Sequence, residues 1–249
     1  MLFRFLAGVA LAFSATIAWA DCPHIFVQGT APTVAKAELI CHTNYAIGFR
    51  ADWEDPAWSA EHLTAARVAE ADGFTRKSGG DFHQELLLPK AERVAKADYT
   101  GAGYDRGHMA PAADFGADKP ECFSMANMVP QTKELNEVIW AGIEDAVRDL
   151  ATEDGDLYII TGPGIPTTHE TIDNGRIAVP TQTWKAIYDP VRGAAAYICE
   201  NTHVPVCRAE SVAKLTQQIG FDPFPALPAD VKDTAIALPE PKKGGKLAH

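Results

Sequence analysis

The stretch DRGHMAP, residues 105–111, decides how this 249-residue chain is interpreted. It places a histidine, His108, two residues after an arginine and directly after a glycine that lets the backbone turn sharply. A second pattern follows, with NMVPQ at residues 127–131 and then Asn136 and Trp140. Asn136 lies 28 positions after His108 and supplies a carboxamide that could reach a metal ion. Either pattern alone would be weak evidence, whereas the ordered pair is specific.

Together the two patterns resemble the DNA/RNA non-specific endonucleases of the ββα-metal (His-Me finger) superfamily, which includes secreted bacterial nucleases and the mitochondrial endonuclease G. The resemblance covers roughly residues 22 to 205. Further matching pieces are ADYTG (97–101), TGP (161–163), VPT (179–181) and Trp184-Lys185. The resemblance implies a sugar-non-specific endonuclease that hydrolyses DNA and RNA phosphodiester bonds with Mg²⁺ and leaves 5′-phosphate ends. Nothing in the residues excludes Mn²⁺ in place of Mg²⁺.

Two other functions stay open at this point. The first is a catalytically inactive, nuclease-like protein that binds nucleic acid or a partner. The second is a phosphodiesterase restricted to small nucleotides. The resemblance also allows a homodimer, although no interface can be identified from the sequence.

Three residues form the expected catalytic centre. His108 is the candidate general base, because an imidazole with a pKa of about 6.5 can accept a proton from water near neutral pH. The resemblance implies that Asn136 is the direct metal ligand, with waters and phosphate completing the oxygen shell that Mg²⁺ prefers. Glu144 would accept hydrogen bonds from metal-bound waters. The alternatives are a structural histidine, a helix N-cap for Asn136 and a solvated glutamate for Glu144.

Charge neutralisation at the phosphate is assigned to two arginines. Arg106 and Arg76 are candidates for both catalysis and substrate binding, because a cation stabilises the developing negative charge. Lys77 is an alternative to Arg76. Asn127 is a candidate substrate-binding residue, with an equally supported alternative in which it organises the loop facing the site. Asp105 is expected to orient its hairpin through hydrogen bonds.

The apolar spacing predicts a mixed α+β fold with a mainly antiparallel core sheet. Strands are expected at the following residues: 45–50, 58–64, 157–161, 177–179, 183–188 and 194–199. Residues 54–56 are expected to form a turn, and residues 90–96 a short helix. Ile139, Ile143, Val147 and Leu150 recur at helical spacing and predict a helix over 133–150. A hairpin containing residues 104–110, followed by this helix, is the ββα-metal element that the resemblance implies.

On an α-helix, Asn136, Trp140 and Glu144 share one side, because they follow one another at intervals of four residues. This spacing predicts that Asn136 and Glu144 face the hairpin that bears His108.

The two ends of the chain differ from the middle. Residues 1–20 have the form of a signal peptide, with Arg4, an apolar run and an Ala-x-Ala end, and an uncleaved membrane anchor is the alternative. Residues 21–220 are expected to form one endonuclease domain. Residues 221–249 are rich in proline, contain lysine and are expected to be an extended, partly disordered tail. The mature protein is therefore expected to be exported to the periplasm or the medium, without a membrane span.

The five cysteines fit an oxidising compartment. Proximity in the sequence favours the disulfides Cys22–Cys41 and Cys199–Cys207. Cys122 is then left over, as either a buried thiol or an intermolecular bridge.

The net charge of −11 is unusual for a protein that binds a polyanion. Removal of Arg4 with the signal peptide gives −12 for the mature chain. Between residues 76 and 108, however, six Lys or Arg outnumber five Asp or Glu. Bound divalent cations would add positive charge where phosphate binds. The overall charge therefore argues against tight binding more than against cleavage.

Overall fold

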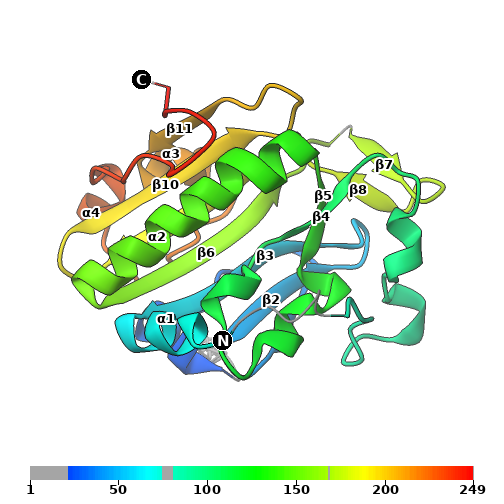
Figure 1. The fold of residues 1–249 in the computed structure, drawn as a ribbon, viewed down its shortest axis with the longest axis horizontal. Coiled ribbons are helices and arrows are strands. Elements are labelled where there is room, and N and C mark those ends of the chain that lie inside the picture. Colours follow the sequence, from blue (N-terminus) through cyan, green and yellow to red (C-terminus); the bar gives the residue numbers. More distant parts are fainter. Residues whose placement is uncertain (1–21, 75–80, 168, 249) are drawn as a thin grey trace, which may run out of the picture.

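A seven-stranded antiparallel sheet forms the centre of the computed structural model, which describes residues 22–74, 81–167 and 169–248 (Figure 1). In spatial order its strands are β1 (Ala37–Cys41), β2 (Tyr45–Arg50), β3 (Asp55–Thr64), β6 (Asp156–Gly164), β9 (Gln182–Asp189), β10 (Gly193–Glu200) and β11 (Cys207–Glu210). Two short antiparallel pairs lie outside this sheet: β4 (Asp105–His108) with β5 (Met128–Gln131), and β7 (Glu170–Ile172) with β8 (Ile177–Val179). The predicted α+β class with an antiparallel core is confirmed.

Helices cover both faces of the sheet. The α-helices are α1 (Ala65–Asp72), α2 (Ala141–Asp154), α3 (Val212–Ile219) and α4 (Ala229–Asp233). A π-helical turn, η8 (Leu135–Trp140), leads directly into α2. The 3₁₀ turns are η1 (Pro23–Ile25), η2 (Val27–Gly29), η3 (Lys90–Glu92), η4 (Lys96–Tyr99), η5 (Ala112–Asp114), η6 (Lys119–Phe123) and η7 (Met125–Asn127).

Alternation along the strands places hydrophobic clusters on both faces of the sheet. In β6, Ile159 packs with α2 on one face of the sheet, and its neighbour Ile160 packs with α3 on the other. Ile143 and Val147 of α2 belong to the first cluster, as their helical spacing predicted. Both faces of the sheet are therefore covered, with α2 on one and α3 on the other.

The predicted strands lie within observed ones, but the turn at residues 54–56 is placed differently. Strand β3 begins at Asp55, so Pro56 belongs to the strand, paired with Phe49. The register shifts between Gly48 and Phe49, and such an irregularity tolerates a proline that cannot donate a ladder hydrogen bond. The short helix expected at 90–96 is replaced by the separate turns η3 and η4. The sequence patterns did not predict β1, α1 or α3.

The described part of the C-terminal tail differs from the expected extended, partly disordered appendage. Phe224 and Leu227 are buried with α3, and Leu247 is buried near α2. Proline prevents regular ladders, but it does not prevent side chains between prolines from packing. The described part of the tail therefore packs against the preceding residues, and the proposed boundary at residue 220 stays a prediction.

Both predicted disulfides, Cys22–Cys41 and Cys199–Cys207, are formed. Cys122 is fully buried, which fits the interpretation as a buried thiol, and burial raises the pKa of this thiol well above its usual range. The predicted signal peptide lies outside the described residues. Within the described ranges, no helix combines the length and apolar character needed to cross a membrane.

Candidate active site

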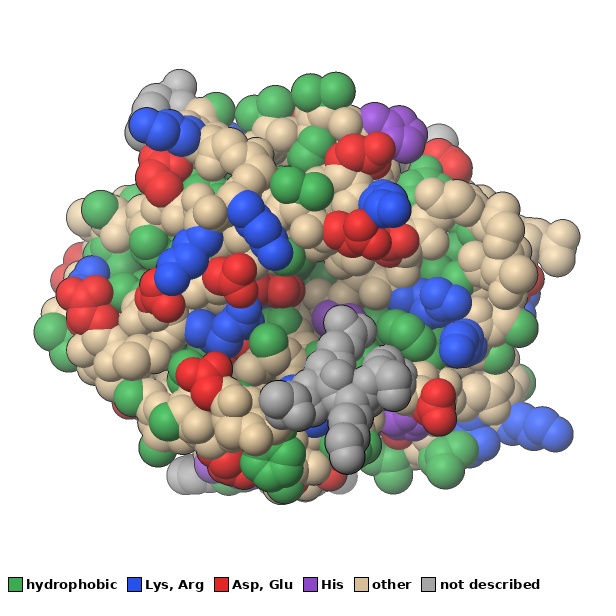
Figure 2. Space-filling model, in the orientation of Figure 1, with side chains coloured by type: hydrophobic (Ala, Val, Ile, Leu, Met, Phe, Trp, Pro, Cys, Tyr) green, Lys and Arg blue, Asp and Glu red, His purple; other side chains and the backbone are tan. Residues whose placement is uncertain are grey.

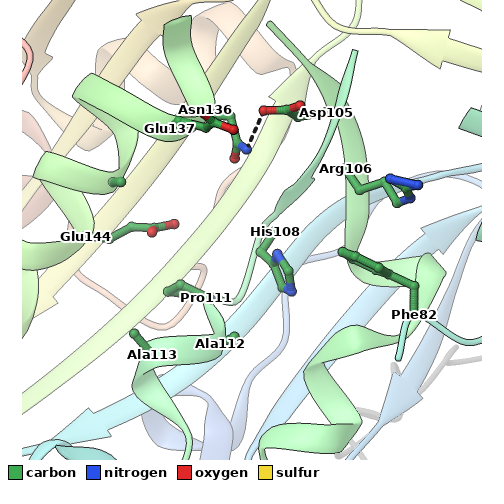
Figure 3. Close-up of a pocket in the computed structure, with 11 residues that line it drawn as sticks. Phe82, Asp105, Arg106, His108, Pro111, Ala112, Ala113, Asn136, Glu137 and Glu144 are labelled. Atoms are coloured by element: carbon green, nitrogen blue, oxygen red, sulfur yellow. Dashed lines mark hydrogen bonds between the residues drawn. The ribbon is translucent and has the colours of Figure 1, made fainter. Parts of the chain in front are cut away.

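A cavity of about 530 Å³ lies between the β4–β5 hairpin, turn η5 and the helix formed by η8 and α2 (Figure 3). It is lined by Phe82, Asp105, Arg106, His108, Pro111, Ala112, Ala113, Asn136, Glu137, Ala141 and Glu144. Four of the predicted site residues, Arg106, His108, Asn136 and Glu144, therefore meet here. Arg76 and its alternative Lys77 lie outside the described residues.

Arg106 and His108 lie on the β4–β5 hairpin on either side of Gly107, where the side chain of Gln131 packs against the backbone. A Cβ added to Gly107 would lie 1.9 Å from Gln131 Oε1, so the glutamine side chain occupies the space that any larger residue would need. Gln131 Nε2 donates to Thr183 Oγ1 (2.9 Å), which connects the hairpin to β9 of the core sheet. The glycine of the DRGH motif thus allows this buried contact.

The imidazole of His108 is packed between aromatic rings. The Phe123 ring lies edge-on with its centroid 5.0 Å away, and the Phe82 ring is tilted at 5.7 Å. Pairing of His108 with Met128 fixes its backbone in the hairpin. Because these contacts restrict the ring, His108 faces the cavity in a defined direction (Figure 3).

Asn127 lies behind the hairpin and does not line the cavity. Its side chain is fully buried. Asn127 Oδ1 accepts from Ser59 Oγ (2.7 Å) and Ala110 N (3.0 Å). Asn127 Nδ2 donates to the carbonyls of Ala110 and Cys122, both at 2.9 Å. The candidate substrate-binding role therefore does not fit its position, and the alternative of organising the loop does.

The helix side of the cavity is shaped by the π-turn. A π-turn closes its hydrogen bonds from residue i to i+5, one residue more than an α-helix, and the cavity side is formed by Asn136, Ala141 and Glu144. Trp140, which α-helical spacing placed on this side, is buried in the core, with Lys185 Nζ 5.5 Å from its ring. The prediction for Trp140 is wrong because it assumed a regular α-helix.

The two sides of the cavity are joined by a hydrogen bond from Asn136 Nδ2 to Asp105 Oδ2 (3.0 Å, Figure 3). The amide nitrogen is thereby occupied, which leaves the Asn136 carboxamide oxygen for a cation. Asp105, Glu137 and Glu144 add carboxylate oxygens to the lining. This oxygen-rich donor set suits a hard cation such as Mg²⁺. Among the described residues, no group of three or more His, Cys, Asp or Glu is arranged to hold a metal, so water and substrate would supply the remaining ligands.

The guanidinium of Arg106 is held by aromatic rings. It lies 5.0 Å from the centroid of Phe82 and 5.9 Å from that of Tyr99. Among the described residues, no carboxylate lies within ion-pair distance of Arg106, unlike Arg148, which pairs with Asp114. Its positive charge therefore remains available to an anionic ligand.

The sequence patterns match one family over most of this chain. The pattern of the DNA/RNA non-specific endonuclease family matches residues 23–230. The chain belongs to this family. Nuclease C1 of Cunninghamella echinulata var. echinulata is 35% identical over 160 residues, covering 59% of this chain and 63% of that protein. A nuclease of Nostoc sp. is 32% identical over 170 residues, covering 64% and 58%.

A mitochondrial nuclease and a solved structure extend the comparison. The mitochondrial nuclease EXOG of Danio rerio is 29% identical over 215 residues, covering 77% of this chain and 62% of EXOG. The chain thus spans about six tenths of the length of these three relatives. The crystal structure of the EndoG/EndoGI complex contains a chain that superimposes with a TM-score of 0.72 at 26% identity, covering 88% of this chain and 95% of that one.

In this member of the DNA/RNA non-specific endonuclease family, two carboxyl groups in and near the cavity have raised pKa values. Burial raises the pKa of Glu144 to about 7, against the opposing effect of Lys185 and Arg148. Glu61 of β3 is buried, and burial and the nearby Asp114 raise its pKa as well. The sequence interpretation missed Glu61, although its alternation with Leu63 along β3 places both on the same face of the sheet. It also missed Phe82 and Glu137.

The face of this endonuclease family member that holds the cavity has mixed charge. Acidic and basic side chains are interspersed over it (Figure 2). The cavity itself contributes Arg106 against Asp105, Glu137 and Glu144. A cation bound among these carboxylates would change the local sign, which is how an acidic protein could accept phosphate.

Proposed function

We propose that the protein is an exported, sugar-non-specific endonuclease that hydrolyses phosphodiester bonds in DNA and RNA and leaves 5′-phosphate ends. The observation that carries this proposal is the meeting of His108, Arg106 and Asn136 in one cavity, from two separate segments of the chain. Family membership and the names of the relatives support it.

His108 acts as the general base. It takes a proton from a water molecule that lies between the imidazole and the scissile phosphate. The rings of Phe82 and Phe123 limit rotation of the imidazole, which keeps its nitrogen directed at that water. The phenyl rings also make this side of the cavity apolar, which strengthens the electrostatic interactions there.

Arg106 binds the phosphate. Its guanidinium offers several N–H donors in a planar fork that matches two phosphate oxygens. The nearby rings of Phe82 and Tyr99, with centroids 5.0 Å and 5.9 Å from the guanidinium, restrict its movement before substrate arrives. Arg76 is proposed as a second phosphate contact. A site that contacts the backbone in this way carries little base specificity.

Asn136 would hold Mg²⁺, or Mn²⁺ in its place, through its carboxamide oxygen, and Glu144 would orient the waters of the ion. The chemistry that a bound cation would supply is stabilisation of the negative charge that develops during cleavage. Asp105 keeps the Asn136 amide in the orientation that presents the oxygen. A nearby cation would also favour the charged form of Glu144, whose pKa burial raises to about 7 against the opposing effect of Lys185 and Arg148.

Export is proposed from the signal-like segment and from the two disulfides, which persist in oxidising compartments. A homodimer is also proposed, and sedimentation of the purified protein would show one-chain or two-chain mass.

The test of the function is nicking of supercoiled plasmid and of a folded RNA by purified residues 21–249 in Mg²⁺. EDTA should abolish cleavage, and His108→Ala should lower its rate by roughly 10²- to 10⁴-fold. Absence of cleavage by folded protein, with Mn²⁺ also tried, would favour an inactive binding protein. Cleavage of a dinucleotide but not of plasmid would favour a narrow phosphodiesterase.

A further inference from the structure

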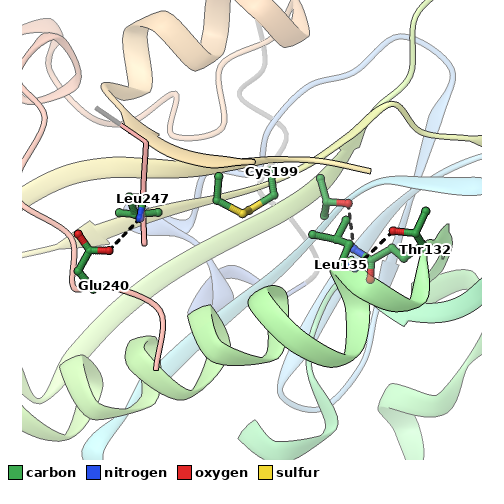
Figure 4. Close-up of a disulfide and its surroundings, with 8 residues drawn as sticks. Thr132, Leu135, Cys199, Glu240 and Leu247 are labelled. Atoms are coloured by element: carbon green, nitrogen blue, oxygen red, sulfur yellow. Dashed lines mark hydrogen bonds between the residues drawn. A yellow bond between two sulfur atoms is a disulfide. The ribbon is translucent and has the colours of Figure 1, made fainter. Parts of the chain in front are cut away.

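The last residues of the chain cross the outside of the helix that carries Asn136. At one end, Tyr197 Oη donates to the carbonyl of Pro239 (2.6 Å), and at the other, Ala248 N donates to the carbonyl of Cys207 (2.7 Å). Leu247 N donates to Glu240 Oε2 (2.8 Å), which closes the segment into a loop (Figure 4). Residues 239–248 are called the C-terminal strap below. The strap lies outside residues 23–230, which match the family.

The strap meets the helix at the π-turn, backbone against backbone. A Cβ on Gly244 would lie 2.6 Å from the Cα of Ile139, which belongs to η8. A Cβ on Gly142, at the start of α2, would lie 2.5 Å from the carbonyl oxygen of Lys243. Lys242 N donates to the carbonyl of Gly142 (3.0 Å). Two glycines therefore permit an approach that no other residue allows at either position.

Side chains hold the strap in place on both sides of this contact. Lys242 forms an ion pair with Asp149, and Lys243 Nζ lies 3.9 Å from Asp145 Oδ2. Leu247 is buried in the same cluster as Leu135 and the Cys199–Cys207 disulfide (Figure 4). Because Leu135 directly precedes Asn136, the strap and the disulfide both support the first residues of the π-turn.

We propose that the C-terminal strap fixes the π-turn and thereby the direction of the Asn136 side chain, with Gly244 as a positioning residue. The consequence for metal binding rests on the proposed role of Asn136. A π-turn is unfavourable alone and persists where surrounding structure holds it. Relaxation to α-helical geometry would shift Asn136 by one helical position, roughly 100° about the axis, and would turn its carboxamide away from Asp105.

The test compares Gly244→Ala with the matched control Gly245→Ala. Both glycines have positive φ, 86° and 112°, so both substitutions strain the backbone. Only at Gly244 does the new Cβ meet the helix, because nothing lies within 4 Å of the Cβ position at Gly245. Gly142→Ala disrupts the same contact from the helix side, because its Cβ would meet the carbonyl oxygen of Lys243. This variant replaces Gly244→Ala in the test if Gly244→Ala does not fold.

Two readouts are needed, and the first requires no metal. Hydrogen exchange of the amides at 135–141, measured by mass spectrometry, should be faster in Gly244→Ala and Gly142→Ala than in Gly245→Ala. Calorimetric titration with Mg²⁺ alone should show about tenfold weaker binding in the same two variants, the effect typical of losing support behind a metal ligand.

Faster exchange confined to residues 239–248, with residues 135–141 unchanged, would overturn the proposal, because the strap would then be loose without affecting the turn. Equal exchange at 135–141 in all three variants would overturn it as well. If the unmodified protein binds no Mg²⁺, the metal role of Asn136 fails separately, since exchange alone reports whether the strap holds the turn.

Discussion

The hairpin side and the helix side of the cavity are stabilised by different means. Buried carboxamides hold the hairpin: Asn127 makes four hydrogen bonds behind it, and Gln131 connects it to β9. On the helix side, the π-turn is contacted by the backbone of the C-terminal strap. The hairpin support lies within the segment that matches the family, whereas the strap lies beyond it. Support for the proposed base therefore lies within the segment that matches the family, and support for the proposed metal ligand includes a segment outside it.

The largest expected effects are on kcat and on Mg²⁺ binding, and they distinguish the hairpin side of the cavity from the helix side. His108→Ala should lower kcat by roughly 10²- to 10⁴-fold, because proton transfer is lost. It should leave the half-saturating Mg²⁺ concentration unchanged. Asn136→Ala should instead raise that concentration, because the direct oxygen ligand is removed. Initial rates of plasmid nicking across a Mg²⁺ series would measure both quantities.

Circular dichroism of both variants provides the control for folding. A His108→Ala protein that keeps its kcat but loses Mg²⁺ affinity would reverse the two assignments. It would place the histidine, and not the carboxamide, on the metal.

A smaller expected effect, on the free energy of unfolding, tests which hydrogen bonds stabilise the hairpin side of the cavity. Asn127→Ala removes four buried hydrogen bonds and leaves Ser59 Oγ and Ala110 N without this partner. The free energy of unfolding should fall by about 4 kcal/mol, near 1 kcal/mol for each bond. Ser59→Ala removes one of the four, and it should cost about 1 kcal/mol. Urea unfolding of the two variants and the unmodified protein measures the difference; equal losses would show that Asn127 contributes through Ser59 alone.

The same comparison shows what could be predicted from the sequence. Arg106, His108, Asn136 and Glu144 were found because their order and spacing follow a family pattern, and all four line the cavity. Asn127 is part of that pattern too, but a carboxamide serves equally well in a buried network or at a substrate. Only the surrounding donors and acceptors distinguish the two.

Other features depended on contacts between distant segments. The π-turn was not predicted, because the apolar spacing of Ile139, Ile143 and Val147 is compatible with a regular α-helix. The strap was not predicted either, because prolines and glycines in a tail are also typical of disorder. The antiparallel sheet was predicted because alternation is a local property of each strand, whereas the register at Pro56 depends on its partner strand.

The smallest expected effect is on the free energy of unfolding at low pH. It concerns Glu85, which contacts the hairpin side of the cavity through Ser124. Glu85 is buried and accepts hydrogen bonds from His42 and from Ser124, which lies three residues before Asn127. Burial alone would raise its pKa, but the hydrogen bonds from His42 and Ser124 outweigh burial and hold the pKa at about 2. Because the pKa is lower in the folded state, Glu85 stabilises the fold above its unfolded pKa near 4.5.

This stabilisation, at most about 3 kcal/mol for such a shift, is lost as the pH falls from about 4.5 toward 2. In Glu85→Gln that part of the pH dependence should be absent, as measured by urea unfolding at several pH values in this window. Asp52 is the matched control, because its pKa is also lowered, by Arg50 first, but its side chain is 40% exposed. Solvent screening should leave Asp52→Asn with almost no change. If both variants lose the same pH dependence, burial does not distinguish the two carboxylates, and the hairpin side is not selectively weakened by acid.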